Sequence, residues 1–335
     1  MDAYHLTREL VDIPSITEEE HAVGEYTERV LQQLASRTGG EVQRLGVTAE
    51  RFNVLATWGS PAVTLSTHMD TVPPFFASRE DDERIWGRGA CDAKGIMAAM
   101  ICAAERLLRE NNSNFALLFV VGEERNSAGA DVAARYHSGS KYLINGEPTQ
   151  NKLASGSKGV LRYEIVARGK MAHSAYPELG ESAIEKLLDA LAQIRKIELP
   201  LDRLLGASTL NIGTIHAGRA PNVIADEAMA EILVRLVDDG DSTRAAISAA
   251  AARAGAGAHE ILCIPAIALE TLPGFEASVV AFTTDIPAFN GAWGKPFLIG
   301  PGSIHHAHTS EEHISKRELE QAITIYSQMV KKLVA

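Results

Sequence analysis

Cysteine is scarce in this chain. Only three cysteines occur in 335 residues, namely Cys91, Cys102 and Cys263. They are too few and too scattered for a disulfide framework or a thiolate zinc site. Any metal that the protein binds must therefore be held by histidine and carboxylate side chains.

Long hydrophobic runs and basic clusters are also absent. The apolar stretch FALLFVV at 115–121 is far shorter than the roughly 18 residues of a membrane span. The net charge of -11, with no Lys/Arg run longer than a pair, disfavours nucleic acid as a partner. The N-terminal MDAYHLTREL lacks the basic start and apolar block of an export signal. We therefore expect a cytoplasmic protein that binds no membrane.

What is present is material for a large folded core. Hydrophobic residues make up 46% of the chain and charged residues 22%. Short apolar runs alternate with helical stretches, which is typical of a mostly parallel sheet covered by helices. The predicted strands of this α/β core are 52–58, 62–67, 115–122, 141–145 and 295–300. The predicted helices lie in the first forty residues, with a break at Pro14, at about 93–109 and at about 315–334.

Between about 155 and 272 the pattern changes to that of an α+β domain. Alternating strand patterns occur at 160–169, 207–218 and 228–237, and a helix is predicted at 181–196. After residue 272 the chain returns to the first pattern. We therefore predict one domain of residues 1–154 and 273–335, and a second domain, residues 155–272, inserted into it.

Acidic and histidine side chains follow the carboxyl ends of several predicted core strands, where open α/β sheets bind their ligands. They are His68, Asp70, Glu123, Glu124, Glu147 and His308, with Asp92 at the start of the helix predicted at 93–109. Imidazoles and carboxylates without thiolates form the ligand set expected for zinc, cobalt or manganese. His68 and Asp70 leave the same face of an extended segment, so one can bind a metal while the other orients it.

Each of these residues also has a purely structural interpretation. Asp92 is well placed to cap a helix. The pair Glu123 and Glu124 could be the solvated start of another helix, and Glu147 precedes a proline in a turn. From the residues alone these alternatives stay open.

Seven segments together resemble the two-metal peptidase family of acetylornithine deacetylase, succinyl-diaminopimelate desuccinylase and aminoacylase. They are LSTHMDTVP, WGRGACDAKGIMAAM, VVGEERNSAG, INGEPT, GKMAHSAYP, IHAGRAPNVI and GPGSIHHAHTSEEH. The likeness covers essentially the whole chain. It implies a catalytic metal-binding domain and an inserted lid, which in many members also forms the dimer interface.

The resemblance implies a role for each residue of the candidate metal site. The expected metals are two divalent ions, most simply zinc, with cobalt or manganese as alternatives. Asp70 would orient a ligand, and Glu123 would be the general base that takes a proton from the attacking water and returns it to the departing amine. The implied ligands are His68 and Glu147 for one metal, Glu124 and His308 for the other, and Asp92 as the bridge.

Four histidines lie close together at 305, 306, 308 and 313. We assign the ligand role to His308, because the family places its last ligand in an A-H-x-x-x-E stretch and AHTSEE fits it. His305 and His306 would then support the site or face solvent.

The resemblance also implies substrate contacts. His173 would reach into the partner's active site and stabilise the oxyanion, and Asn222 would contact the substrate. Arg235 would hold the substrate carboxylate with its planar fork, and Asp285 would select a basic side chain. The alternatives are a structural histidine, a turn residue, a solvent-facing strand residue and a helix cap.

The sequence therefore predicts a homodimeric, metal-dependent hydrolase that removes the acyl group of an N-acetyl amino acid. Within the family the segments are most similar to the deacetylases of acetylornithine, acetylcitrulline and acetyllysine, in arginine or lysine biosynthesis. Alternatives with the same metal centre are a metallo-carboxypeptidase, a dipeptidase or succinyl-diaminopimelate desuccinylase. A non-catalytic dimeric binding protein is the alternative of another class, which the complete set of ligands disfavours.

Overall fold

The computed structural model describes residues 1–136 and 139–334, and the chain divides into two compact units. The first unit contains Met1–Ser155, Leu269–Ser278 and the chain from Thr284 to the end of the C-terminal helix. The second contains Gly156–Ala268 and Val279–Thr283. The long segment of the second unit begins and ends within four residues of the predicted insertion. The short segment at 279–283 has no separate signal in the sequence.

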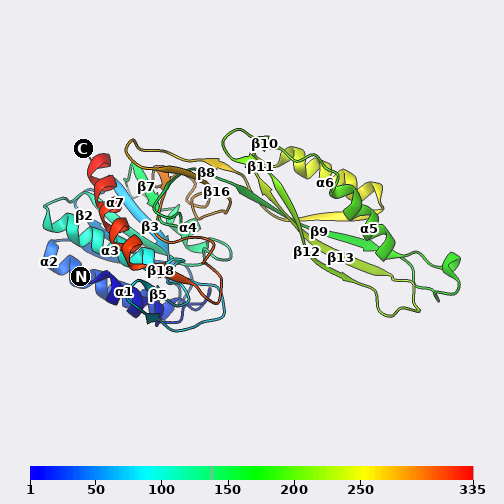
Figure 1. Cartoon of the computed structure of the whole chain (residues 1–335), viewed down its shortest axis with the longest axis horizontal. Helices are drawn as coiled ribbons and strands as arrows, with labels where there is room; N and C mark the ends of the chain where they lie inside the picture. Colours follow the sequence, from blue (N-terminus) through cyan, green and yellow to red (C-terminus); the bar gives the residue numbers. More distant parts are fainter. Residues whose placement is uncertain (137–138, 335) are drawn as a thin grey trace. The chain divides into compact units, whose positions relative to one another are not determined.

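A six-stranded mixed sheet forms the centre of the first unit (Figure 1). In sheet order its strands are β1 (Glu41–Gly46), β2 (Phe52–Trp58), β6 (Phe115–Val120), β3 (Val63–His68), β7 (Tyr142–Asn145) and β17 (Lys295–Leu298). The last four run parallel to one another, whereas β1 and β2 pair antiparallel at one edge. The α/β core is thus as predicted, with β1 as a strand that the sequence pattern did not indicate.

The strand β6 shows why the central strands read as continuous apolar runs. Its alternate residues Phe115, Leu117 and Phe119 join one hydrophobic core, and Ala116, Leu118 and Val120 join another on the opposite face of the sheet. A strand that is buried on both faces has no polar side to give an alternating pattern.

The other strands of the sheet and the helices packed on it contribute further residues to these two cores. The helices of the first unit are α1 (Ala3–Val11), α2 (His21–Thr38), α3 (Lys94–Arg109), α4 (Ala128–Ala133) and α7 (Lys316–Val334). The helix α3 packs between α1 and α7 (Figure 1), and for this reason its apolar residues extend around most of its surface. The predictions for α1, α2, α3 and α7 are confirmed to within a few residues.

The second unit is a four-stranded antiparallel sheet with two helices packed on one face (Figure 1). Its strands, in order, are β12 (Thr209–Ala217), β13 (Glu227–Leu236), β9 (Gly159–Arg168) and β14 (Ala256–Ile264), and its helices are α5 (Ala183–Ile194) and α6 (Asp241–Arg253). In β13 every second residue is buried, as alternation predicts for a sheet with one covered face. The predictions overlooked α6, whose alanine-rich sequence has little apolar periodicity, and β14, which is mostly exposed.

The remaining elements are short. They are β4 (Arg79–Glu80), β5 (Arg84–Trp86), β8 (Leu153–Ser157), the 3-10 helix η1 (Pro177–Leu179), β10 (Leu201–Asp202), β11 (Gly206–Ala207), β15 (Ile267–Ala268), β16 (Ala277–Val280) and β18 (His313–Ser315). Within the described residues, no helix is both long and apolar enough to cross a membrane.

Candidate metal centre and active site

The parallel strands of the first unit end at one edge of the sheet, and the candidate ligands follow those ends. His68 is the last residue of β3, and Glu147 comes two residues after β7. Glu123 and Glu124 come just after β6, and His308 lies in the loop that follows β17. Carboxyl ends of parallel strands are the usual ligand-binding edge of an open α/β sheet.

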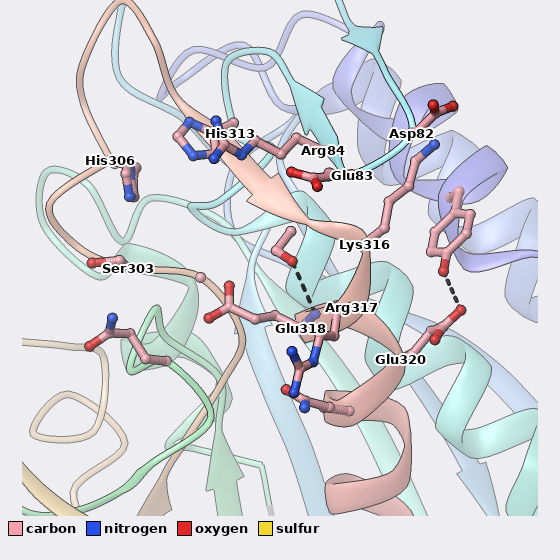
Figure 2. A pocket seen from close by; sticks show the side chains of 15 residues that line it. Asp82, Glu83, Arg84, Ser303, His306, His313, Lys316, Arg317, Glu318 and Glu320 are labelled. Carbon is pink, nitrogen blue, oxygen red and sulfur yellow. Dashed lines mark hydrogen bonds between the residues drawn. The ribbon is translucent and has the colours of Figure 1, made fainter.

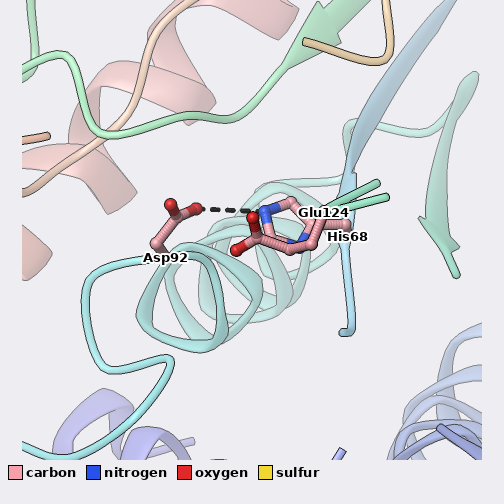
Figure 3. A group of neighbouring side chains, drawn as sticks. All are labelled: His68, Asp92 and Glu124. Atoms are coloured by element: carbon pink, nitrogen blue, oxygen red, sulfur yellow. Dashed lines mark hydrogen bonds and ion pairs between the residues drawn. The ribbon is translucent and has the colours of Figure 1, made fainter. Parts of the chain in front are cut away.

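Asp92 offers one carboxylate oxygen to each of two histidines. Its Oδ1 lies 3.0 Å from Nε2 of His68, and its Oδ2 lies 3.4 Å from Nε2 of His308. The same nitrogen of His308 lies 2.9 Å from Oε1 of Glu124. His68, Asp92 and Glu124 bring ligand atoms within 4.8 Å of one another (Figure 3). This is the arrangement expected if Asp92 bridges two cations.

The helix-related interpretations of Asp92, Glu123 and Glu124 are wrong. Asp92 does not cap α3, because the N-cap position is Ala93 and no side chain caps the helix. Glu123 and Glu124 do not open a helix, since α4 begins only at Ala128. Glu147 is buried, with an exposed fraction of 4%, and its Oε1 has no hydrogen-bond partner among the described residues.

Asp70 orients His68 in a different way from the one expected. The Nδ1 atom of His68 lies 2.9 Å from the main-chain oxygen of Asp70, whereas the Asp70 carboxylate is 3.6 Å away. That carboxylate instead accepts hydrogen bonds from the backbone N–H groups of Gly122, Glu123 and Glu124, at 2.9, 3.1 and 3.2 Å. Asp70 therefore holds both a candidate ligand, His68, and the loop that carries the candidate base.

The carboxylates of the site carry more negative charge than the protein compensates. Within the described part of the chain, no lysine or arginine forms an ion pair with Asp92, Glu123, Glu124 or Glu147. Burial raises the pKa of Glu123 and Glu147 well above the usual value, and the charge of Glu147 raises that of Glu123 further. Burial also raises the pKa of Glu124, although its bond to His308 opposes this.

These carboxylates also shift the pKa values of His68 and His308. Burial disfavours a charge on His68, but the carboxylates of Asp70 and Asp92 outweigh it and raise its pKa well above the usual value. The bonds to Asp92 and Glu124 raise the pKa of His308 to about 10. Burial favours the neutral form of Asp92, yet the bonds to His308 and His68 prevail and lower its pKa.

These residues fit a pair of divalent cations. The donor set contains imidazole nitrogens and carboxylate oxygens only, as zinc, cobalt and manganese accept. The unpaired buried oxygen of Glu147 and the uncompensated carboxylates need positive charge close by. His68 and Glu147 would hold one cation, Glu124 and His308 the other, and Asp92 both.

The neighbouring histidines lie elsewhere. The rings of His306 and His313 are in contact, with centroids 4.1 Å apart, and both line a separate polar cavity of about 740 Å³ at the start of α7 (Figure 2). Burial lowers the pKa of His306, and the neighbouring His313 lowers it further. His305 is exposed. Of the four clustered histidines, only His308 contacts the candidate ligands among the described residues.

The second unit brings His173 and Asn222 together. His173 forms an isolated antiparallel bridge with Val223, and the Ser174 N–H donates to the main-chain oxygen of Asn222 at 3.0 Å. Nδ1 of His173 accepts a hydrogen bond from the Ala175 N–H at 3.1 Å. Because Nδ1 is an acceptor, the proton of the neutral ring resides on Nε2, which is exposed and can donate.

Arg235 lies on β13 and is partly buried. Burial lowers the pKa of its guanidinium, and no carboxylate pairs with it among the described residues. Its position alternates with the buried residues of β13, so its side chain leaves the sheet on the face opposite the core. A half-buried, unpaired guanidinium is suited to bind an external anion.

Asp285, in the first unit, is almost fully buried, with an exposed fraction of 1%. Ser127 lies near enough to favour its charged form, but neither carboxylate oxygen has a partner at hydrogen-bonding geometry in the described structure. Burial raises its pKa to about 7, and its charge raises the pKa of Glu123 and Glu147. It caps no helix, since the Thr284 hydroxyl accepts the Ile286 N–H instead. Asp285 is thus an unpaired carboxylate in the electrostatic field of the metal site.

Two residues at the site received no role from the sequence, namely Arg88 and Glu312. Both are buried, and Nη1 of Arg88 donates to Oε2 of Glu312 at 2.5 Å. The signal for Glu312 was present, because it is the final glutamate of the A-H-x-x-x-E stretch that identified His308. Arg88 lies in WGRGACDAK, where glycines on both sides suggested only a turn.

Known proteins are similar to this chain in sequence. Residues 64–332 match the model of peptidase family M20/M25/M40. A peptidase M20 domain-containing protein of Schizosaccharomyces pombe is 37% identical over 97% of this chain and 83% of its own length. A probable carboxypeptidase of Aspergillus niger is 36% identical over 98% of this chain and 88% of its own length.

Solved structures share the fold at lower identity. An M20 family metallo-carboxypeptidase from Sulfolobus solfataricus has a TM-score of 0.80 at 18% identity, covering 99% of each chain. A dinuclear metal-binding M20 peptidase from Bacillus subtilis has a TM-score of 0.69 at 17% identity, covering 98% of this chain and 96% of its own. The family match over residues 64–332, together with the relatives at 36% and 37% identity, shows that the chain belongs to peptidase family M20/M25/M40.

Proposed function

We propose that this protein hydrolyses the amide bond between an acyl group and the nitrogen of a terminal amino acid that bears a free carboxylate. The observation that carries the proposal is the position of Asp92, whose two oxygens face His68 and His308 separately. Beside this group lies Glu123, which forms no ion pair among the described residues. A bridging carboxylate next to a free acid is the arrangement that two-metal hydrolysis requires.

In this mechanism each residue has one task. When bound, the two cations, most simply zinc, polarise the acyl carbonyl and make water a better nucleophile. Glu123 accepts a proton from the attacking water and passes it to the amine as the C–N bond breaks. The Asp70 carboxylate keeps Glu123 in place by accepting the hydrogen bond from the Glu123 backbone N–H.

The lid residues complete the proposal. His173 donates from Nε2 to the oxyanion that forms as water adds to the carbonyl, and Asn222 contacts the substrate beside it. Arg235 binds the carboxylate of the amino acid, as its lack of a partner within the described residues supports. We also propose that the lid mediates a homodimer in which His173 serves the partner's site. Sedimentation should then give a dimer, and an active protein that remains a monomer at assay concentration would exclude this arrangement.

For the substrate, we propose an N-acetylated basic amino acid such as acetylornithine, with acetylcitrulline or acetyllysine as alternatives. The buried, unpaired Asp285 supports this choice, because a substrate ammonium would supply the charge that its carboxylate lacks. A carboxypeptidase is the second candidate, supported by the names of relatives such as the probable carboxypeptidase of Aspergillus niger. Both activities cleave the same kind of bond next to a carboxylate.

One substrate panel tests these alternatives. It contains acetylornithine, acetylcitrulline, acetyllysine, succinyl-diaminopimelate and two dipeptides, with zinc- or cobalt-loaded enzyme and a chelated control. Metal-dependent turnover of an acetyl amino acid supports the deacetylase, and turnover of dipeptides alone supports the peptidase. No turnover of any compound by a protein with two bound metals would favour a binding protein.

Asp285→Asn sharpens the test. Acetylornithine and acetylcitrulline share the same three-carbon side-chain stem, which ends in an ammonium in acetylornithine and in a neutral ureido group in acetylcitrulline. If Asp285 selects that charge, the substitution should lower kcat/KM for acetylornithine and leave that for acetylcitrulline nearly unchanged. An equal loss for both compounds would remove Asp285 from substrate selection.

A further inference from the structure

Glu312 has a buried carboxylate that organises the loop containing the candidate ligand Asp92. Its side chain is fully buried. Its Oε1 accepts hydrogen bonds from three backbone N–H groups, those of Gly89 at 2.9 Å and of Cys91 and Asp92 at 3.2 Å each. The segment 89–92 is therefore wrapped around this oxygen.

The opposite oxygen of Glu312 faces an equally buried cation. Arg88 is 2% exposed, and its Nη1 donates to Oε2 of Glu312. Its Nε donates to the main-chain oxygen of Pro74 at 3.2 Å, and its guanidinium lies 4.8 Å from the centre of the Phe76 ring. The carboxylate is thus compensated on both sides, by N–H dipoles and by a fixed charge.

The wrapped segment needs a backbone that few residues can adopt. Gly89 has a φ of +86°, in the left-handed region, and a Cβ there would lie 2.8 Å from Cγ2 of Thr71. This glycine lets the chain turn so that the N–H groups on both sides converge on Glu312. Asp92 is the last of the three donors, and its side chain leaves the same turn toward His68 and His308.

Glu312 also comes from the segment that carries His308, four residues earlier in the chain. Further bonds join this segment to the Asp92 loop. The Gly87 N–H donates to the main-chain oxygen of Glu312 at 3.1 Å, and the Cys91 thiol donates to the main-chain oxygen of Ser303 at 3.4 Å. The Glu312 carboxylate and these main-chain oxygens therefore join the two segments that carry the candidate ligands Asp92 and His308.

We infer that Glu312 is a positioning residue for the metal centre. It holds Asp92 in the orientation in which each of the two Asp92 carboxylate oxygens can bind one of two cations. The inference rests on the proposed function, because it takes Asp92 as the bridging ligand. Without Glu312, three N–H groups of the loop lose their acceptor, and the Asp92 carboxylate is free to turn away from one histidine. Both cations would then bind more weakly, since they share this ligand.

The test is cobalt binding to the full chain after chelator treatment, followed by the absorption of bound Co²⁺ and by equilibrium dialysis. The variant is Glu312→Met, which keeps the length of the side chain but offers the three N–H groups no oxygen. The matched control is Glu311→Met, because the Glu311 carboxylate is exposed and pairs with Arg79 on the surface. We expect a loss of about 10- to 100-fold in Co²⁺ affinity and a changed absorption spectrum for Glu312→Met only. Wild-type affinity and spectrum in Glu312→Met would overturn the inference.

Arg88→Met separates positioning from stability. It removes the ion pair but leaves the three N–H groups on the carboxylate, so it should lower the melting temperature while the Co²⁺ spectrum stays like that of the wild type. A purely structural role for Glu312 predicts instead that both variants lower the melting temperature and that neither alters the spectrum. That result would also overturn the inference.

Two further outcomes are distinguishable. If Glu312→Met alone does not fold because it leaves Arg88 without a counterion, the double variant Arg88→Met/Glu312→Met removes both charges and is read in the same way. Failure of the proposed function has a different signature, in which the wild-type protein and Asp92→Asn bind Co²⁺ equally. A shared loss in Asp92→Asn and Glu312→Met, with Glu311→Met unaffected, supports both proposals.

Discussion

The Asp70 carboxylate accepts a hydrogen bond from the backbone N–H of Glu123 at 3.1 Å. The same oxygen accepts the Gly122 N–H, and the other oxygen accepts the Glu124 N–H and the Thr17 hydroxyl. Its main-chain oxygen meanwhile fixes Nδ1 of His68. One residue therefore joins a candidate ligand to the candidate base, although the family resemblance implied only the first of these tasks.

Asp70→Asn tests this relationship. An amide has only one acceptor oxygen, so its NH₂ group must face at least one N–H donor of the 122–124 loop. We expect kcat to fall by about 10- to 100-fold with weaker metal binding, as for other residues that orient ligands. Thr17→Val removes only one hydrogen bond to the same carboxylate and is the milder control. Equal effects of the two variants would contradict the role of Asp70 in holding the loop.

Glu123→Gln should separate catalysis from metal binding. Because the proposed base is not a ligand, the variant should retain both metals while kcat falls by at least about 10²- to 10⁴-fold. Glu124→Gln is the matched control, since it changes the neighbouring acid that contacts His308 and should lose metal. Kinetics together with metal analysis distinguish the two. Loss of metal from Glu123→Gln would show that the roles of these two residues are wrongly assigned.

The sequence predicts the parts of this fold that depend on burial patterns. The strands β3 and β6 and the helices α3 and α7 were all recognisable, because core packing demands apolar residues at these positions. Elements with little periodicity escaped recognition. The edge strand β1 is mostly exposed, and α6 is rich in alanine.

The candidate site was predictable to the level of residue type and position in the chain. That His68 and Glu124 meet follows from β3 and β6, which are parallel neighbours with their carboxyl ends at one edge, whereas Asp92 reaches them from the loop that precedes α3. Contacts made by main-chain atoms are not indicated by residue type or by position in the sequence. The three N–H groups on Glu312 depend on the path of the loop, and the sequence offers only its glycines as a hint.

His173→Ala should affect chemistry more than binding. If the exposed Nε2–H of His173 stabilises the oxyanion, the interaction exists mainly in the transition state, and kcat should fall by about 10²- to 10³-fold with little change in KM. His216, an exposed histidine on β12 of the same unit, provides the control variant His216→Ala. Steady-state kinetics on the preferred substrate decide the question. A change in KM alone would make His173 a binding residue.

Asp285 gives a prediction for the stability of the metal-free protein. Its pKa is about 7 in the folded chain, against an ordinary value of 3.8. Between these values the folded state keeps a proton that the unfolded state has released, so the free energy of unfolding falls as pH rises from about 4 to about 7. The shift corresponds to at most roughly 4 kcal/mol.

Asp285→Asn should therefore stabilise the protein at pH 8 and have little effect near pH 4. Denaturant unfolding in chelator at both pH values measures this, with Asp131→Asn, at an exposed neighbour, as the control. A stability difference that is the same at both pH values would mean that Asp285 is charged in the folded chain.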